Sequence, residues 1–318
     1  MNFTRERVRG TQSPGSTDDV VYAEGLRKSY GDNVAVDGVD LEVQRGEIFG
    51  LLGPNGVGKT TTVECLQGLR RRDGGRVRVL GLDPDVQGDE LRRRIGSQLQ
   101  SSALPDRLRV GETLELFART QEDTLPVSEL ARRWGLQELT GRPFAKLSGG
   151  QQQRLFIALA LINRPQVVFF DELTTGLDPQ ARRTTWELIR KVRDEGATVV
   201  LVTHFMEEAE YLCDRVAIVD RGCIVAMDTP SRLVASTGVP ISVSFTWSDA
   251  ELPWLSHISG IEDVSRSQEV VEVRGDGSLA VRVAAALAQR DVFPNDFQTH
   301  YPNLEDVFLA LTGRDLRN

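Results

Sequence analysis

Hydrophobic and polar residues alternate along two segments near the start of the regular part of the chain, residues 20–30 and 34–43. This spacing predicts a pair of antiparallel strands with one solvent-exposed face. Three later runs are apolar almost throughout, at residues 48–53, 167–170 and 199–203. Such runs are typical of central parallel strands covered on both faces, and ligands bind beyond the carboxyl ends of those strands. The pattern therefore predicts an α/β fold in which the residues after these three runs meet in one crevice.

Helical spacing dominates from about residue 90 to 150, which we interpret as a mostly helical insert. A long helix is predicted from Asp178 to about Glu195, because aspartate is a good N-cap and Pro179 fits the first helical position. Beyond residue 230, exposed alternating strands and amphipathic helices predict a second, smaller α+β domain. We thus expect three parts: a disordered polar tail at 1–18, an α/β domain at 19–235 and an accessory α+β domain at 236–318.

The composition argues against several classes of protein. A net charge of −8, from 38 basic and 46 acidic residues, argues against a dedicated nucleic-acid binder. No apolar run approaches the roughly 20 residues that span a bilayer, and the first residues lack the apolar stretch of a signal peptide, so we expect a cytosolic protein. Cys65, Cys213 and Cys223 have no paired spacing and are expected to be reduced thiols.

The apolar run at 48–53 leads into GPNGVGKT, which matches the phosphate-loop pattern G-x-x-x-x-G-K-[ST]. Its glycines let backbone N–H groups line an anion cradle at the start of a helix. Lys59 is expected to place its charge on the β- and γ-phosphates, and the Thr60 hydroxyl to bind Mg²⁺. The predicted phosphate-binding residues are Gly53, Pro54, Asn55, Gly56, Val57, Gly58, Lys59, Thr60 and Thr61.

Two carboxylates, Asp171 and Glu172, directly follow the run at 167–170. A carboxylate at a strand end opposite a phosphate loop can hold Mg²⁺, and the next carboxylate can orient and deprotonate an attacking water. We therefore interpret Asp171 as a metal ligand and Glu172 as a general base. The alternative is a solvated acidic turn, which the phosphate loop disfavours.

A second element suited to phosphate is LSGGQQQR at residues 147–154. It places a serine and two glycines where a helix is predicted to begin. A helix N-terminus with free N–H groups binds anions without a lysine.

The order of these motifs resembles that of ATP-binding cassette (ABC) ATPases over about residues 20–230. GPNGVGKT resembles their Walker A motif, LSGGQ their signature, VVFFDE their Walker B motif, TGLD their D-loop and THFMEEAE their switch-histidine segment. The resemblance implies a P-loop NTPase fold with a RecA-like core, an antiparallel β subdomain and a helical subdomain. It also implies ATP and Mg²⁺ as ligands.

Roles for single residues follow from the same resemblance. Tyr30 matches the aromatic residue that stacks on adenine, although it also fits a half-buried strand tyrosine. Glu172 matches the catalytic base, and His204 matches the switch histidine that contacts the γ-phosphate and the attacking water. For the glutamine that senses Mg²⁺ and couples to the transporter, Gln100 is the better candidate and Gln98 the alternative.

The signature residues imply a partner chain. Ser148, Gly149, Gly150 and Gln151 match residues that face the γ-phosphate held by a second protomer. The resemblance therefore implies a dimer, expected to be a homodimer, with two composite ATP sites.

One position departs from the family pattern. Leu173 stands where the family usually has proline, which adds a backbone N–H and frees φ. We hypothesise an active enzyme with a slightly less rigid loop, and an ATP turnover of Leu173→Pro equal to that of the wild type would end that hypothesis.

The segment YPNLEDVFLALTG at residues 301–313 resembles the tail of drug-exporter cassettes of the daunorubicin-resistance type, and it also fits an ordinary amphipathic helix. The resemblance implies the ATP-hydrolysing subunit of an exporter, at the cytoplasmic side of the membrane, bound to a separate membrane subunit of about six spans. The implied cargo is a drug, an antibiotic or a similar small hydrophobic molecule. Lipid, polysaccharide and peptide export remain open.

Two other classes are less well supported. A soluble cassette ATPase that acts on ribosomes or DNA usually carries two cassettes or long coiled coils, and this chain has neither. A non-hydrolysing regulatory subunit is disfavoured by the intact set of Lys59, Asp171, Glu172 and His204.

Overall fold

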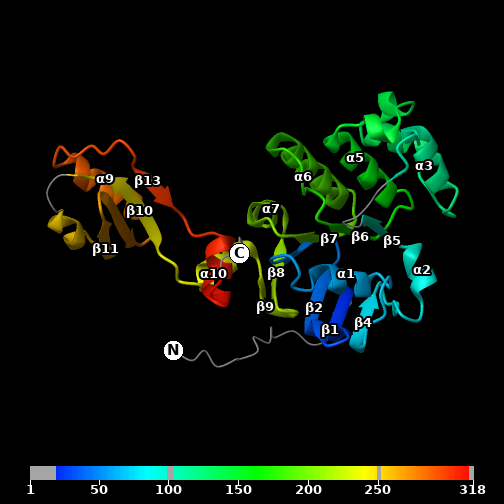
Figure 1. Cartoon of the computed structure of the whole chain (residues 1–318), viewed down its shortest axis with the longest axis horizontal. Coiled ribbons are helices and arrows are strands. Elements are labelled where there is room, and N and C mark those ends of the chain that lie inside the picture. Colours follow the sequence, from blue (N-terminus) through cyan, green and yellow to red (C-terminus); the bar gives the residue numbers. More distant parts are fainter. Residues whose placement is uncertain (1–18, 99–103, 249–251, 315–318) are drawn as a thin grey trace. The chain divides into compact units, whose positions relative to one another are not determined.

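Two compact units make up the chain, and contacts between residues place the division between Pro230 and Ser231. The boundary expected between residues 235 and 236 falls at the end of helix α8 (Pro230–Ser236), whereas this division falls at the start of the helix, because all but its first residue belong to the second unit. The tail expected at 1–18 lies outside the described residues. The computed structural model describes residues 19–98, 104–248 and 252–314 (Figure 1).

A three-stranded antiparallel sheet contains the two alternating segments. They form β1 (Asp19–Tyr30) and β2 (Asn33–Gln44), which pair antiparallel as predicted. Strand β4 (Gly74–Val79) pairs with the other edge of β1, so the order is β2-β1-β4. Val21 and Leu41 are among the residues that point to the buried face of this sheet.

A six-stranded sheet contains the three apolar runs. Its order is β5-β6-β7-β3-β8-β9, and the first five strands run parallel. Every residue of β3, β6 and β7 is buried, which explains their continuous apolar sequence. These three strands are neighbours, so their carboxyl ends lie at one edge of the sheet, as predicted. The strands are β3 (Ile48–Leu52), β5 (Ile95–Gln98), β6 (Val167–Asp171), β7 (Thr198–Thr203), β8 (Arg215–Asp220) and β9 (Cys223–Asp228).

The helices of the first unit are mostly where helical spacing predicts them. α6 begins at Pro179, and the Asp178 carboxylate caps it by accepting a hydrogen bond from the Ala181 N–H at 2.9 Å. The segment expected to be a mostly helical insert contains strand β5. This strand has only four residues, which is too short to show a strand pattern in the sequence, and it forms by pairing with β6. The helices are α1 (Lys59–Leu66), α2 (Gly88–Arg92), α3 (Val110–Ala118), α4 (Val127–Arg133), α5 (Gly149–Ala160), α6 (Pro179–Asp194) and α7 (Met206–Leu212), with 3₁₀ turns η1 (Gln137–Leu139) and η2 (Phe144–Lys146).

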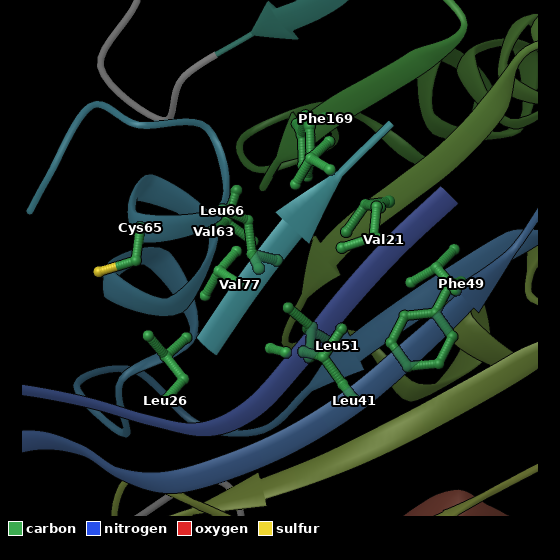
Figure 2. Close-up of a cluster of buried hydrophobic side chains, with 14 of the residues drawn as sticks. Val21, Leu26, Leu41, Phe49, Leu51, Val63, Cys65, Leu66, Val77 and Phe169 are labelled. Carbon is green, nitrogen blue, oxygen red and sulfur yellow. The ribbon is translucent and has the colours of Figure 1, made fainter. Parts of the chain in front are cut away.

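One hydrophobic core joins both sheets to helix α1, and Figure 2 shows part of it. Val63 and Leu66 of α1 belong to the same buried cluster as Val77 of β4 and Leu51 of β3. Because β3 and α1 both pack into this core, the loop that connects them has a fixed position. The core is therefore what holds the phosphate loop at the edge of the sheet.

The second unit has a core of its own. Its four antiparallel strands have the order β11-β12-β10-β13, and buried residues such as Phe245 of β10, Val273 of β12 and Val283 of α9 form one cluster. Across the described part of both units, no helix is long and apolar enough to cross a membrane. The elements are β10 (Ile241–Thr246), η3 (Pro253–His257), β11 (Ile261–Ser267), β12 (Val270–Gly275), α9 (Leu279–Ala288), β13 (Gln298–His300) and α10 (Leu304–Thr312).

Candidate active site

The phosphate loop connects β3 to α1 and fits tightly against its surroundings. Gly58 has φ of 100°, in the region that favours glycine, and a Cβ there would lie 2.0 Å from the Ala35 carbonyl oxygen. A Cβ on Gly53 would lie 2.4 Å from the Val219 carbonyl oxygen. Only residues without a side chain fit at these two points, so the packing of β2 and β8 fixes the course of the loop.

Lys59, the first residue of α1, is held inside this loop. Its Nζ donates hydrogen bonds to the carbonyl oxygens of Gly53 at 2.7 Å and Pro54 at 2.8 Å. The side chain is almost fully buried, and burial lowers the pKa of the ammonium group while the nearby charges of Glu172 and Asp171 oppose that shift. The loop therefore concentrates a positive charge directly opposite two carboxylates.

Asp171, the last residue of β6, faces the start of α1. Burial raises the pKa of its carboxyl group to about 6, and a hydrogen bond with the Thr60 side chain opposes the shift. Its Oδ1 atom is buried and has no hydrogen-bond partner among the described residues. A buried carboxylate oxygen beside a threonine hydroxyl fits Mg²⁺, which prefers hard oxygen ligands. The residues predicted to bind the metal, Thr60 and Asp171, are thus adjacent.

Glu172 and His204 form a hydrogen-bonded pair at the ends of β6 and β7. His204 Nδ1 lies 3.2 Å from Glu172 Oε1, and the Glu172 side chain is almost fully buried. Glu172 has φ of 50°, an uncommon value for a residue with a side chain and one that recurs at active sites. Its N–H donates to the Val202 carbonyl oxygen at 2.9 Å, so pairing with β7 continues into this turn. The arrangement suits a carboxylate that takes a proton from water, beside an imidazole that orients it.

The loop after Glu172 is anchored by contacts that sequence reasoning did not identify. Leu173 is fully buried, and its carbonyl oxygen accepts a hydrogen bond from Gln153 Nε2 of α5. No local sequence signal marks this contact, since the two residues meet only through the packing of α5 against this loop. Whether the departure from proline alters the rigidity of the loop stays a prediction.

The LSGGQ segment opens α5 as predicted. Ser148 is the N-cap residue, and it forms a reciprocal capping box with Gln151: the Gln151 N–H donates to Ser148 Oγ at 3.4 Å, and the Ser148 N–H donates to Gln151 Oε1 at 3.0 Å. Ser148 and Gly149 are exposed and Gly150 is half-buried. A well-formed helix N-terminus is therefore presented at the surface of the first unit.

Three predicted residues remain, and one of them lies outside the described residues. Tyr30 ends β1 and is 40% exposed, and Lys28 and Arg70 lie over its ring at 5.6 Å and 5.2 Å from the centroid. Gln100, the preferred coupling glutamine, lies outside the described residues. Its alternative, Gln98, is the buried last residue of β5.

Known proteins resemble this chain over most of its length. The family model of the ABC transporter matches residues 36–175. Nod factor export ATP-binding protein I of Ralstonia nicotianae is 38% identical over 98% of this chain and 100% of its own length. Daunorubicin resistance ATP-binding protein DrrA2 of Streptomyces coeruleorubidus is 38% identical over 94% of this chain and 96% of its own. A dimeric ATP-binding cassette solved in a post-hydrolysis state with ADP and Pi is 27% identical, with a TM-score of 0.59 over 66% of this chain and 98% of that one.

Proposed function

Because this chain belongs to the family of ABC transporter ATP-binding proteins, we propose that it is the exporter ATPase whose hydrolytic centre is built from Lys59, Thr60, Asp171, Glu172 and His204. The observation that supports this assignment is the convergence of these side chains at the ends of β3, β6 and β7. Cassettes of this family bind and hydrolyse ATP, dimerise, and work with membrane subunits.

Each residue of the centre has a distinct task in the proposed mechanism. Backbone N–H groups of the phosphate loop and the Lys59 ammonium bind the β- and γ-phosphates. Thr60 and Asp171 would hold Mg²⁺, which would share the phosphate charge. Glu172 accepts the proton of the attacking water, and His204 holds that water and the γ-phosphate in line. The Lys59 ammonium already lies inside the phosphate loop, where it donates to the Gly53 and Pro54 carbonyls. When phosphate binds, bonds to phosphate oxygens replace these two hydrogen bonds.

An adenine-binding residue and a second phosphate-binding element complete the proposed nucleotide site. Tyr30 stacks on the adenine, which the partial exposure of this residue supports. Ser148, Gly149, Gly150 and Gln151 bind the γ-phosphate held by the other protomer of a homodimer, because a capped helix N-terminus needs no lysine when the partner supplies one. Two ATP molecules then favour the closed dimer by binding it better than the open one.

The dimer in turn acts on a membrane partner. We assign the chain to the cytoplasmic side of the membrane, bound to a permease subunit of about six spans through the segment that contains Gln100. The proposed cargo is a drug, an antibiotic or a similar small hydrophobic molecule, which the names of the relatives for daunorubicin resistance and Nod factor export support. Export of a lipid, polysaccharide or peptide is the alternative.

The hydrolytic assignment is tested by steady-state ATPase assays. Glu172→Gln keeps the size of the side chain but removes the base, so we expect turnover to fall by a factor on the order of 10²–10⁴ while ATP binding persists. A wild type no more active than Glu172→Gln would overturn the assignment.

The shared-site assignment is tested by mixing two inactive chains. Lys59→Ala damages the phosphate loop and Gly149→Asp damages the signature, so a mixed dimer keeps one intact composite site and one doubly damaged site. We expect each variant alone to fail in ATP-driven dimerisation and the mixture to recover it. Absence of any recovery would contradict either the trans assignment or the independence of the two sites.

A further inference from the structure

A buried carboxylate outside the proposed centre lies in α7, immediately after the switch histidine. Glu208 is fully buried, whereas its neighbours Glu207 and Glu210 are exposed. Its Oε1 atom accepts two hydrogen bonds, from Thr174 Oγ1 at 2.8 Å and from Trp186 Nε1 at 2.8 Å. Thr174 and Trp186 are themselves almost fully buried, so these bonds are shielded from water.

The partners of Glu208 come from the segments that carry the hydrolytic pair. Thr174 lies in the loop that follows Glu172, and Trp186 lies on α6, which this loop enters. Glu208 itself lies on α7, which follows His204. One carboxylate thus links the loop behind the proposed base to the helix behind the switch histidine.

Two ring contacts also connect α6 to the segment of His204. The Arg182 guanidinium of α6 stacks on the Phe205 ring at 4.3 Å, and that ring contacts His204 at a centroid distance of 4.1 Å. Burial raises the pKa of the Glu208 carboxyl group, and hydrogen bonds with Thr203, Thr174 and Trp186, together with the charge of Arg182, oppose that shift. His204 is therefore in contact with both Glu172 and Phe205.

Burying a carboxylate is costly, and an apolar side chain of similar volume would fill the same space without that cost. What the carboxylate supplies is geometry, because it accepts from two donors on different elements at once. We propose that Glu208 is a positioning residue, which holds the loop of Glu172 against the segment of His204 so that the two side chains stay at hydrogen-bonding distance. The inference rests on the proposed ATPase function.

The test uses the full-length chain and measures kcat and KM for MgATP, the Kd of a fluorescent ATP analogue, and Tm. Glu208→Ala removes both acceptor contacts, and displacements of about 1 Å near reacting groups cost rates of about a hundredfold. We therefore expect kcat to fall by about tenfold or more, with the nucleotide Kd within about threefold of the wild type. Glu208→Gln keeps one carbonyl oxygen that can accept from both donors, and we expect it to retain kcat within about threefold.

The exposed neighbour provides the matched control, because Glu207→Ala removes a carboxylate from the same helix turn and is expected to leave kcat unchanged. If Glu208→Ala does not fold, Thr174→Val removes one of the two hydrogen bonds with little change of volume. We expect it likewise to lower kcat while leaving the nucleotide Kd almost unchanged. An unchanged kcat in a folded Glu208→Ala or Thr174→Val protein would overturn the inference, as would a rise in KM or Kd that accounts for the whole loss. The proposed function fails separately, through a wild type that is no more active than Glu172→Gln.

Discussion

Asp171→Asn measures what the burial of this carboxylate costs the folded protein. Asp171 is 2% exposed, and burial raises the pKa of its carboxyl group from 3.8 to about 6. A pKa that is higher in the folded state means that folding favours the protonated form, so stability is greatest at low pH and is lost as the pH rises from about 4 through 6. The difference between 3.8 and about 6 is worth about 3 kcal/mol, because each pKa unit corresponds to about 1.36 kcal/mol. Neutral asparagine does not bear this cost.

Urea unfolding of both proteins at pH 5 and pH 8, without Mg²⁺, provides the assay. Comparing the two proteins at each pH cancels the other titrating groups, and we expect the variant to gain about 1.5 kcal/mol at pH 5 and about 3 kcal/mol at pH 8. Asp32→Asn, at an exposed turn, is the control for the substitution itself. A gain that is equal at both pH values, or a variant that is less stable at pH 8, would refute the reasoning. ATP with Mg²⁺ should stabilise the wild type more than the variant, because only the carboxylate can pair with the cation.

Two further substitutions test the walls of the nucleotide site. Gly58→Ala puts a methyl group 2.0 Å from the Ala35 carbonyl oxygen in a backbone conformation unsuited to alanine, so we expect a loss of about 2 kcal/mol or more in urea unfolding and a loss of nucleotide binding; normal binding would show that the loop relaxes. Tyr30→Ala should weaken ATP binding about three- to tenfold in a fluorescence titration while Tyr30→Phe should not, since the ring alone supplies stacking; equal losses in both would point to the hydroxyl instead.

The strands that carry the site were predictable because a strand that is buried on both faces has an uninterrupted apolar sequence. β3, β6 and β7 are apolar without interruption, and each ends in a polar segment, so their shared edge follows from the geometry of parallel strands alone. The start of α6 was equally predictable, since Asp178 and Pro179 satisfy local requirements of a helix N-terminus. β5 was not, because four residues at a sheet edge owe their strand conformation to pairing with β6.

Contacts between side chains that are far apart in the sequence could not be predicted, for a different reason. In α7, Met206, Ala209 and Leu212 mark the buried face, and Glu208 lies beside them although its type suggests solvent. Its orientation becomes understandable only when Thr174 and Trp186 are brought next to it by the packing of α6. The same holds for Gln153 and the Leu173 carbonyl. Residue type predicts what a side chain can bind, whereas tertiary packing decides which partner it meets.

The two buried charges at the edge of the sheet, Lys59 and Asp171, have opposite signs and are stabilised by ligands of opposite charge. Burial shifts Lys59 and Asp171 toward their neutral forms, lowering the pKa of the first and raising that of the second. A phosphate placed beside Lys59 would reverse the first shift, and a divalent cation beside Asp171 would reverse the second. Either ligand alone leaves one of the two charges without its partner, whereas a phosphate bound to a cation satisfies both at once. The electrostatics of the fold thus favour the metal–nucleotide complex over its separate components, so in the proposed mechanism Mg²⁺ and ATP should bind with positive coupling.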